Sequence, residues 1–282
     1  MAYLSPWRER WRTARAGMAS AGRHWRLCRR RAGTLLETAW AQIPSPCLLC
    51  RERARGGCLC EACRRDAMAS RVAAPCCERC GLNAGSDAGT GIPAGVPFES
   101  CPDCSALSPA FDKVIAAFDY AFPGDVLLRQ FKQQHRFQHG RALSELMAQT
   151  LAPALPDWWP QAWLVPIPSS AQALRRRGFN PAAELARRLE ARLGAGVRTD
   201  ILSRRREADA ARVQKRLPRR QRLQTPALAF ECRVPLAGAR IVLVDDVMTT
   251  GATLHGAAQV LRQAGAQSLW GVVAARTPYQ AR

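Results

Sequence analysis

The chain has 282 residues, enough for one large domain or two modest ones with a real hydrophobic core. Its formal net charge of +20 comes mostly from arginine and favours polyanionic partners such as nucleic acid, phosphorylated metabolites or anionic membrane surfaces. The alternative explanation of the charge is a general preference for arginine that is unrelated to any binding partner. No run of 18 or more apolar residues occurs, which excludes a hydrophobic membrane-spanning helix.

Residues 1–43 form a basic segment rich in Arg and Trp. Residues 1–31 hold nine arginines against one acid, Glu9, with three tryptophans between them. This pattern is typical of a basic amphipathic segment on a membrane or nucleic acid, of a disordered arm, or of an organellar transit peptide. The segment lacks the uninterrupted apolar run of a secretory signal. We therefore expect a cytoplasmic protein, for which peripheral membrane contact stays open.

Eight of the twelve cysteines form four Cys-x-x-Cys pairs. This spacing lets two thiolates from one tight turn approach a metal ion, and two such turns complete a tetrahedral site. Disulfides would need an oxidising compartment, and iron–sulfur spacings usually differ. The pairs predict a double zinc ribbon over residues 44–108, with two closed structural sites for Zn²⁺. The predicted ligands are Cys47, Cys50, Cys60 and Cys63 for the first site, and Cys77, Cys80, Cys101 and Cys104 for the second.

Residues 109–282 predict an α/β domain. The apolar, aromatic and β-branched content of residues 111–120 indicates a strand or hairpin, and two helical patterns follow up to Leu151. A short strand over 163–168 is closed by prolines and leads into a loop that starts at Ser169. A helix over 181–193 comes next, and residues 204–222 then hold nine Arg or Lys against two acids. That basic run indicates a solvated basic helix or hairpin, or a functional segment.

Residues 241–253 read Ile-Val-Leu-Val-Asp-Asp-Val-Met-Thr-Thr-Gly-Ala-Thr. The apolar start predicts a buried strand, directly followed by Asp245 and Asp246. The hydroxyl- and Gly-bearing loop opens a helix near Leu254, where backbone N–H groups and the positive helix end suit a phosphate. The two carboxylates suit ribose hydroxyls or hydrated Mg²⁺. The run therefore predicts a phosphoribose site beyond the carboxyl end of a sheet strand.

This run resembles the loop of type I phosphoribosyltransferases that binds 5-phosphoribosyl-1-pyrophosphate (PRPP). The resemblance implies an open, mostly parallel sheet with flanking helices, and PRPP bound with Mg²⁺. Asp245 and Asp246 take the catalytic positions that hold the ribose. The residues 204–222 lie where these enzymes carry a flexible flap. The resemblance assigns the 5′-phosphate to Thr249, Thr250, Gly251, Ala252 and Thr253, and the pyrophosphate to Ser169, Ser170, Arg175, Arg176 and Arg177.

Taken in their order along the chain, the features of residues 44–277 resemble those of the ComF competence-protein family, which includes GntX-like proteins. The shared marks are the double zinc ribbon, Phe-Asp-x-Val with Lys132 after it, Val-Pro-Ile-Pro (165–168), Arg-Gly-Phe-Asn (177–180), Ala-Phe (229–230) and the PRPP loop. The resemblance implies a role in natural transformation, in which the protein handles incoming single-stranded DNA beside a helicase-like ATPase.

Three departures from the family patterns bear on catalysis. Thr225 stands where an Asn is usual, and Pro181 where a Gln is usual. Thr249 occupies the position at which purine-type relatives carry an Asp as general base, and a hydroxyl cannot accept a proton near neutral pH. Three functions therefore stay open: a ComF-like protein of DNA uptake, an active phosphoribosyltransferase of base or nucleotide salvage, and a PRPP-sensing adaptor without chemistry.

Overall fold

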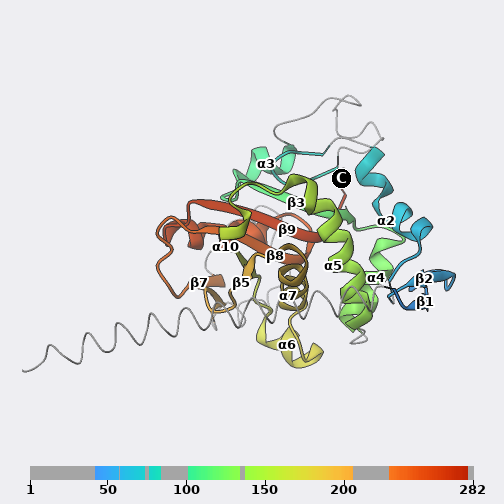
Figure 1. Cartoon of the computed structure of the whole chain (residues 1–282). Helices are drawn as coiled ribbons and strands as arrows, with labels where there is room; N and C mark the ends of the chain where they lie inside the picture. The colour runs from blue at the N-terminus through green and yellow to red at the C-terminus, as the bar shows by residue number, and fades with distance from the viewer. Residues whose placement is uncertain are drawn as a thin grey trace, which may run out of the picture. The chain divides into compact units, whose positions relative to one another are not determined.

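The computed structural model describes residues 42–56, 58–73, 76–83, 101–133, 137–205 and 229–278 (Figure 1). The expectations for the N-terminal basic segment up to residue 41, for residues 206–222 and for Thr225 lie outside the described residues. The elements below all belong to the unit that begins at Pro44.

A five-stranded sheet forms the centre of this unit, and each strand runs parallel to its neighbours. Along the sheet the strands are β3 (Lys113–Asp119), β9 (Ser268–Arg276), β8 (Arg240–Met248), β4 (Trp163–Pro166) and β5 (Gly196–Val197). Strand β8 lies in the middle, where both of its faces are covered, and its residues 241–244 are buried. The predicted parallel α/β fold is confirmed, and the segment 111–120 forms a strand rather than a hairpin.

Helices cover both faces of the sheet because successive side chains of a strand point to opposite faces. Val242 and Val244 share a core with residues of the helices on one face, whereas Ile241 and Leu243 pack in the core formed with the helix on the other face. The first face carries α4 (Gly124–Gln133), α5 (Phe137–Leu151) and α7 (Pro181–Leu193), and the second carries α10 (Ala252–Gln263). The 3₁₀ turns η2 (Ala152–Ala154) and η3 (Trp159–Gln161) lead from α5 to β4.

A second, antiparallel pair of strands lies beside α10. Strands β6 (Leu202–Arg204) and β7 (Phe230–Cys232) pair with each other, with Arg204 opposite Phe230. The guanidinium of Arg204 also lies over the Phe230 ring, 5.3 Å from its centroid. These two strands therefore place Arg204, where the basic run begins, beside Phe230, where the chain continues after the undescribed residues 206–228.

The cysteine-bearing part of the chain packs against the edge strand β3. It contains the antiparallel pair β1 (Pro44–Pro46) and β2 (Arg53–Arg55), followed by α2 (Glu61–Ala73) and α3 (Pro102–Leu107). The backbone N–H of Val114 in β3 donates to the carbonyl of Arg79 at 2.8 Å. A buried polar group adds to this contact: Arg71 Nη1 lies 3.5 Å from Asp119 Oδ1, and Asn83 donates to Asp119 Oδ2 at 2.7 Å.

Candidate functional site

The acid pair lies inside strand β8, not after it. Pairing with β9 continues from Asp245, opposite Val273, to Met248, opposite Arg276. The sequence-based expectation that the strand ends before the acids is therefore wrong, because the long partner strand β9 keeps the backbone of β8 extended through Met248. The pair still lies near the carboxyl end of the central strand, which is the edge where ligands bind in open α/β sheets.

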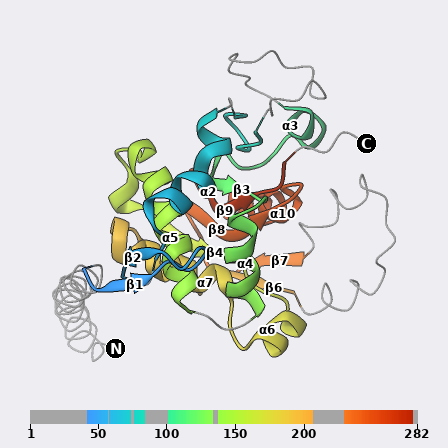
Figure 2. The ribbon, with the colours of Figure 1, turned by 90° about the vertical axis from the view of Figure 1, so that its right-hand side faces the viewer.

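The two carboxylates meet a cation from helix α4. Lys132 Nζ lies 2.8 Å from Asp246 Oδ2, and both side chains are mostly buried. The backbone N–H of Asp246 donates to Asp245 Oδ1 at 2.9 Å, which fixes the orientation of the first carboxylate. Burial, and next the charge of Asp246, raise the pKa of Asp245 well above the usual range of a carboxyl group. In Figure 2, α4 is seen in front of the central strands.

The predicted phosphate loop joins β8 to α10 through Thr249, Thr250 and Gly251. Gly251 is the residue before the first helical one and has a φ of 79°, which favours glycine. A Cβ at this position would approach Cε of the buried Met248 to 2.6 Å. Thr250 Oγ1 accepts a hydrogen bond from the N–H of Ala252 at 3.4 Å. The loop thus places hydroxyl groups and the first N–H groups of a 12-residue helix together, which suits an anion.

The predicted pyrophosphate loop leaves the neighbouring strand at the same edge. The N–H of Ile167 donates to the carbonyl of Val244 at 2.9 Å, directly before the acid pair. Asn180 holds the loop: its Oδ1 accepts from Ser169 Oγ at 3.1 Å, and its Nδ2 donates to the carbonyl of Ile167 at 3.0 Å. Ser170 Oγ accepts from the N–H of Ala173 and caps α6 (Ala171–Arg177). Both serine side chains therefore have structural roles.

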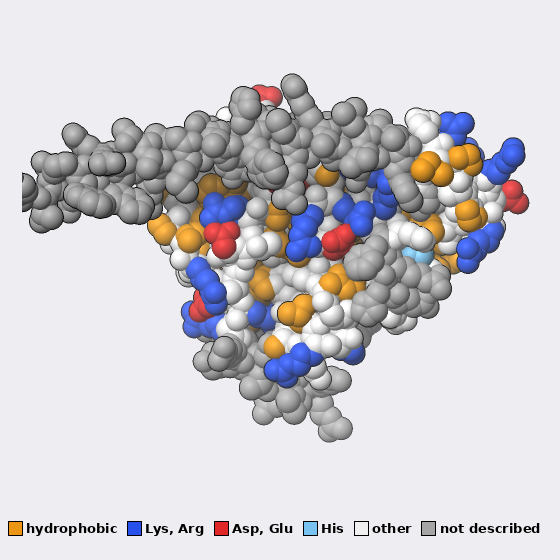
Figure 3. All heavy atoms as spheres, turned by 60° about the horizontal axis from the view of Figure 1, so that its bottom comes forward, with side chains coloured by type: hydrophobic (Ala, Val, Ile, Leu, Met, Phe, Trp, Pro, Cys, Tyr) orange, Lys and Arg blue, Asp and Glu red, His pale blue; other side chains and the backbone are white. Residues whose placement is uncertain are grey.

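The arginines predicted to bind pyrophosphate lie in the last turn of helix α6. Arg175 and Arg176 are exposed and Arg177 is half-buried. Among the described residues, none forms an ion pair with Arg175 or Arg176. Figure 3 brings the side of the molecule with α6 forward and shows basic side chains spread over it, with fewer acidic ones.

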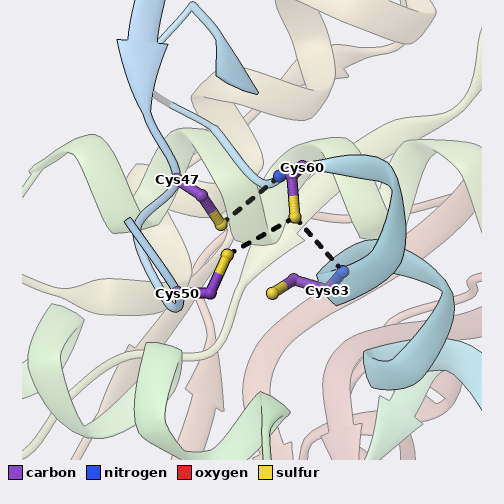
Figure 4. Close-up of side chains that lie close together, drawn as sticks. All are labelled: Cys47, Cys50, Cys60 and Cys63. Carbon is purple, nitrogen blue, oxygen red and sulfur yellow. Dashed lines mark hydrogen bonds between the residues drawn. The ribbon is translucent and has the colours of Figure 1, made fainter. Parts of the chain in front are cut away.

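The first cysteine cluster is formed by the hairpin β1–β2 and the start of α2. In Figure 4 the side chains of Cys47, Cys50, Cys60 and Cys63 are gathered around a common centre, and their sulfur atoms lie within 4.8 Å of one another. The sulfurs of Cys50 and Cys60 are 3.6 Å apart. The N–H of Cys60 donates to Cys47 Sγ at 3.3 Å, which joins the β1–β2 hairpin to the start of α2.

The second cluster is buried in the core that also contains Ile241 and Leu243 of β8. The sulfurs of Cys77 and Cys104 are 3.9 Å apart, and those of Cys80 and Cys101 are 3.3 Å apart. Four thiolates at about 2.3 Å from a tetrahedral zinc would be about 3.8 Å from one another. Both predicted sets of four are thus brought together at spacings that could bind zinc.

Two nearby cysteines are not part of the clusters. Cys58 donates its thiol to the carbonyl of Gly56, and burial raises its pKa to about 12, which keeps it a thiol. Cys76 accepts a hydrogen bond from Arg71 Nη1 at 3.1 Å. Both cysteines therefore lie outside the two sets of four.

A buried arginine at the end of β9, which the sequence motifs do not indicate, also contacts the phosphate loop. Arg276 is 1% exposed, and its Nη1 donates to the backbone carbonyls of Met248 and Thr249. Its Nη2 lies 3.2 Å from Oδ2 of Asp103, a residue of the short helix α3 that stands between Cys101 and Cys104 in the sequence. The only signal in the sequence is a cation directly after the apolar run 269–275, and nothing there indicates its partners.

Within the described residues, no helix has the length and apolar character needed to cross a membrane.

Several known proteins are similar to this chain. The phosphoribosyl transferase domain family matches residues 173–280. The chain is 31% identical over 237 residues to DNA utilization protein YhgH of Salmonella typhi. The matched region covers 80% of this chain and 95% of that protein. It is 29% identical over 182 residues to competence protein F of Haemophilus influenzae, covering 63% and 79% respectively. Among solved structures, it is similar to TT1426 from Thermus thermophilus, with 18% identity, a TM-score of 0.31 and coverage of 51% and 85%.

Proposed function

The chain belongs to the ComF-like family of phosphoribosyltransferase-domain proteins, and we propose that it binds PRPP with Mg²⁺ and handles single-stranded DNA during DNA uptake, on the cytoplasmic side. The observation that carries the PRPP proposal is the joint placement of Asp245, Asp246 and the loop 249–253 at the carboxyl end of β8. The YhgH and competence protein F names, together with the charge of +20, support the DNA proposal.

In this proposal each part of the edge binds one part of PRPP. Asp245 and Asp246 accept hydrogen bonds from the ribose hydroxyls, and the loop 249–253 holds the 5′-phosphate with its N–H and hydroxyl groups. The exposed charges of Arg175 and Arg176 meet the pyrophosphate end. Bound Mg²⁺ would supply further neutralisation of the pyrophosphate charge.

Besides pairing with Asp246 in the free protein, Lys132 has a role when PRPP is bound. Two adjacent carboxylates repel a polyanion, and the ion pair of Lys132 with Asp246 cancels part of that repulsion at 2.8 Å. Asp246 can then accept a ribose hydroxyl on its remaining lone pairs while it keeps the lysine as partner.

Zn²⁺ at the two cysteine clusters is part of the same proposal. The donor sets are thiolates in Cys-x-x-Cys turns with sulfur spacings that suit tetrahedral coordination. Four protein ligands close each site, so the role we assign to the metals is structural.

Two further functions compete with the first: a salvage phosphoribosyltransferase and a non-catalytic PRPP-sensing adaptor. Thr249 at the position of the usual base favours binding without base-assisted turnover. In contrast, an acceptor that needs no base would allow pyrophosphate to be displaced at C1 of the ribose. The helicase-like ATPase partner belongs to the DNA-uptake proposal alone.

A titration of the full chain with PRPP, with and without Mg²⁺, tests the central proposal. Beside it we would run a panel of nucleobases with pyrophosphate detection, and a single-stranded oligonucleotide at several salt concentrations. We expect Mg²⁺-dependent PRPP binding that is lost in Asp246→Asn and kept in Asp200→Asn, an exposed carboxylate paired with Arg198. Pyrophosphate release with a base would favour salvage, and PRPP binding without turnover or DNA binding would favour the adaptor. Absence of both PRPP and DNA binding would overturn the proposal.

A further inference from the structure

We propose that the cluster Cys77–Cys80–Cys101–Cys104, when it holds a metal ion, positions the phosphate loop through Asp103 and Arg276. This inference rests on the proposed PRPP site. It gives the second cysteine cluster a task beyond stabilising its own turns: the geometry of its thiolates sets the geometry of the loop 249–251. Arg276 is then a positioning residue, because it holds the loop backbone and not the ligand.

The contacts of Arg276 form the centre of the argument. A fully buried guanidinium is costly unless its charge is paired and its donors are used, so the contacts of its two terminal nitrogens hold it in place, although Nε has no partner among the described residues. Nη1 donates to the carbonyls of Thr249 and Met248, the latter at 3.4 Å, and also to the carbonyl of Thr277 at 3.1 Å. Nη2 contacts Asp103 at 3.2 Å. One side chain therefore joins the start of the phosphate loop to the cysteine cluster.

The position of Asp103 depends on the cluster. Asp103 lies in α3, a helix of six residues, which is too short to be stable without tertiary contacts. The helix follows Cys101 directly and contains Cys104, and the carbonyls of these two cysteines accept from the N–H groups of Ser105 and Ser108, both at 2.9 Å. Metal ligation of Cys101 and Cys104 would fix both ends of this turn, and with them the carboxylate between.

A second line of contact runs through the core. The four cysteines of this cluster pack in the same hydrophobic cluster as Phe111, Met248 and Leu254, the last in the first turn of α10. Met248 is the residue whose Cε lies closest to the position a Cβ on Gly251 would take. The loop is thus held from the cluster side by a polar contact at Thr249 and by apolar packing under Gly251.

The first cluster offers no such connection. The described hydrogen bonds and ion pairs of Cys47, Cys50, Cys60 and Cys63 link them to one another and to their own turns. It therefore serves as the internal comparison: loss of metal there should leave the phosphate loop unchanged.

Three variants of the full chain test the inference. Arg276→Lys keeps the charge but cannot serve the carbonyls and Asp103 together, and Asp103→Ala removes the carboxylate next to the ligands. Arg262→Lys is the matched control, because Arg262 pairs with Asp112 at 2.6 Å and donates to the carbonyl of Gln267, near the amino ends of the strands. The readouts are zinc per chain, hydrogen exchange of the backbone amides of residues 249–253 without ligand, and PRPP affinity with Mg²⁺ by calorimetry.

We expect Arg276→Lys and Asp103→Ala to weaken PRPP binding by at least about fivefold, and to speed amide exchange in the loop. The control should change affinity by less than about twofold, because distant sites rarely couple. If Asp103→Ala keeps the wild-type PRPP affinity and the wild-type amide exchange of the loop, the inference is overturned. This holds whether or not the variant still contains zinc. If Arg276→Lys does not fold, Asp103→Ala decides alone. If wild-type protein binds no PRPP, the proposed function fails, and the exchange data on the ligand-free chain still decide the coupling.

Discussion

Lys132 of α4 reaches the acid pair of β8, with its Nζ 2.8 Å from Oδ2 of Asp246. The two residues lie far apart in the sequence and meet because α4, which follows the edge strand β3, shares a core with Val242 and Val244 of β8. Figure 2 shows α4 in front of the central strands. Since Asp245 and Asp246 are adjacent and largely buried, a cation at this place lowers the cost of holding two carboxylates together.

Removal of this cation should weaken the binding of a polyanion. In Lys132→Met the two carboxylates face PRPP without the lysine, so we expect the affinity to fall by about tenfold or more and to depend more steeply on Mg²⁺. Lys113→Met is the matched control, because Lys113 lies at the start of β3 over the Trp270 ring. Calorimetric titrations at several Mg²⁺ concentrations measure both. Equal affinity in the two variants would contradict the role of Lys132.

The raised pKa of Asp245 makes the ligand-free protein sensitive to pH. Because burial and Asp246 raise its folded-state pKa, the folded state binds more protons than the unfolded chain, and the free energy of unfolding falls as pH rises above the unfolded value of about 3.9. Asp245→Asn removes this titration. We expect it to be more stable than wild type at about pH 8, with a difference that closes towards about pH 4. Thermal unfolding measures this, at about 2–4 °C per kcal/mol. A difference that does not change with pH would refute it.

The two cysteine clusters should contribute unequally to stability. Cys101 is fully buried in the core that also contains Met248, whereas Cys50 is exposed. We expect Cys101→Ser to cost more than about 4 kcal/mol, or to prevent folding, because it combines loss of a ligand with a buried hydroxyl. Cys50→Ser should lose one zinc per chain and leave the sheet folded. Metal content and thermal unfolding of both variants decide the matter, and equal destabilisation would be the contrary result.

Gly81 fits the contact between the second cluster and β3. Its φ is 62°, and a Cβ there would come within 2.9 Å of the backbone carbonyl oxygen of Val114. Gly238 has a similar φ of 71° but open space around it. We expect Gly238→Ala to cost about 1–2 kcal/mol from the backbone alone. Gly81→Ala should cost about 1–3 kcal/mol more, because neither backbone segment can move freely. Urea unfolding of the two variants gives the difference, which should be near zero if the contact is unimportant.

The exposed arginines of α6 should contribute to anion binding. Arg175→Gln with Arg176→Gln removes two charges without acidic partners among the described residues. If both contact phosphates of single-stranded DNA, the salt slope of binding falls by about 1.4, at about 0.7 for each contact. Arg187→Gln is the control, since Arg187 is exposed on α7 but paired with Glu184. A slope unchanged in the double variant would assign the arginines to PRPP alone or to neither ligand, and the PRPP titration separates these two.

Local patterns were sufficient for the parts of the site that are contiguous in sequence. The run 241–253 contains strand, acids, loop and helix start in one stretch, so its residues could be placed before any tertiary contact was known. The cysteine sets could be predicted for a similar reason, because ligand spacing is a property of single turns. The sulfur atoms of both sets indeed lie within 4.8 Å of one another.

The contacts that depend on topology could not be predicted in this way. Asp103 and Arg276 are separated by 173 residues and meet through tertiary packing, because the cysteine-bearing part contacts β3 and β3 pairs with β9. The sequence predicts too short a strand β8 for a related reason. Polar residues do not favour a strand, but the neighbour β9 continues to Arg276 and supplies hydrogen-bond partners. The serines after β4 illustrate a third case, since their hydroxyl groups hold the loop.

The turn at Arg79 also has a consequence for how the protein behaves in a crowded solution. An uncovered edge strand offers its free N–H and C=O groups to strands of other chains and so invites aggregation. On β3, the N–H of Val114 is taken by Arg79, and the carbonyl of Ala116 accepts from Arg71 at 3.4 Å. At the opposite edge β5 has only two residues. The cysteine-bearing part thereby shields one rim of the sheet, while brevity protects the other, and neighbouring molecules find little backbone there to pair with.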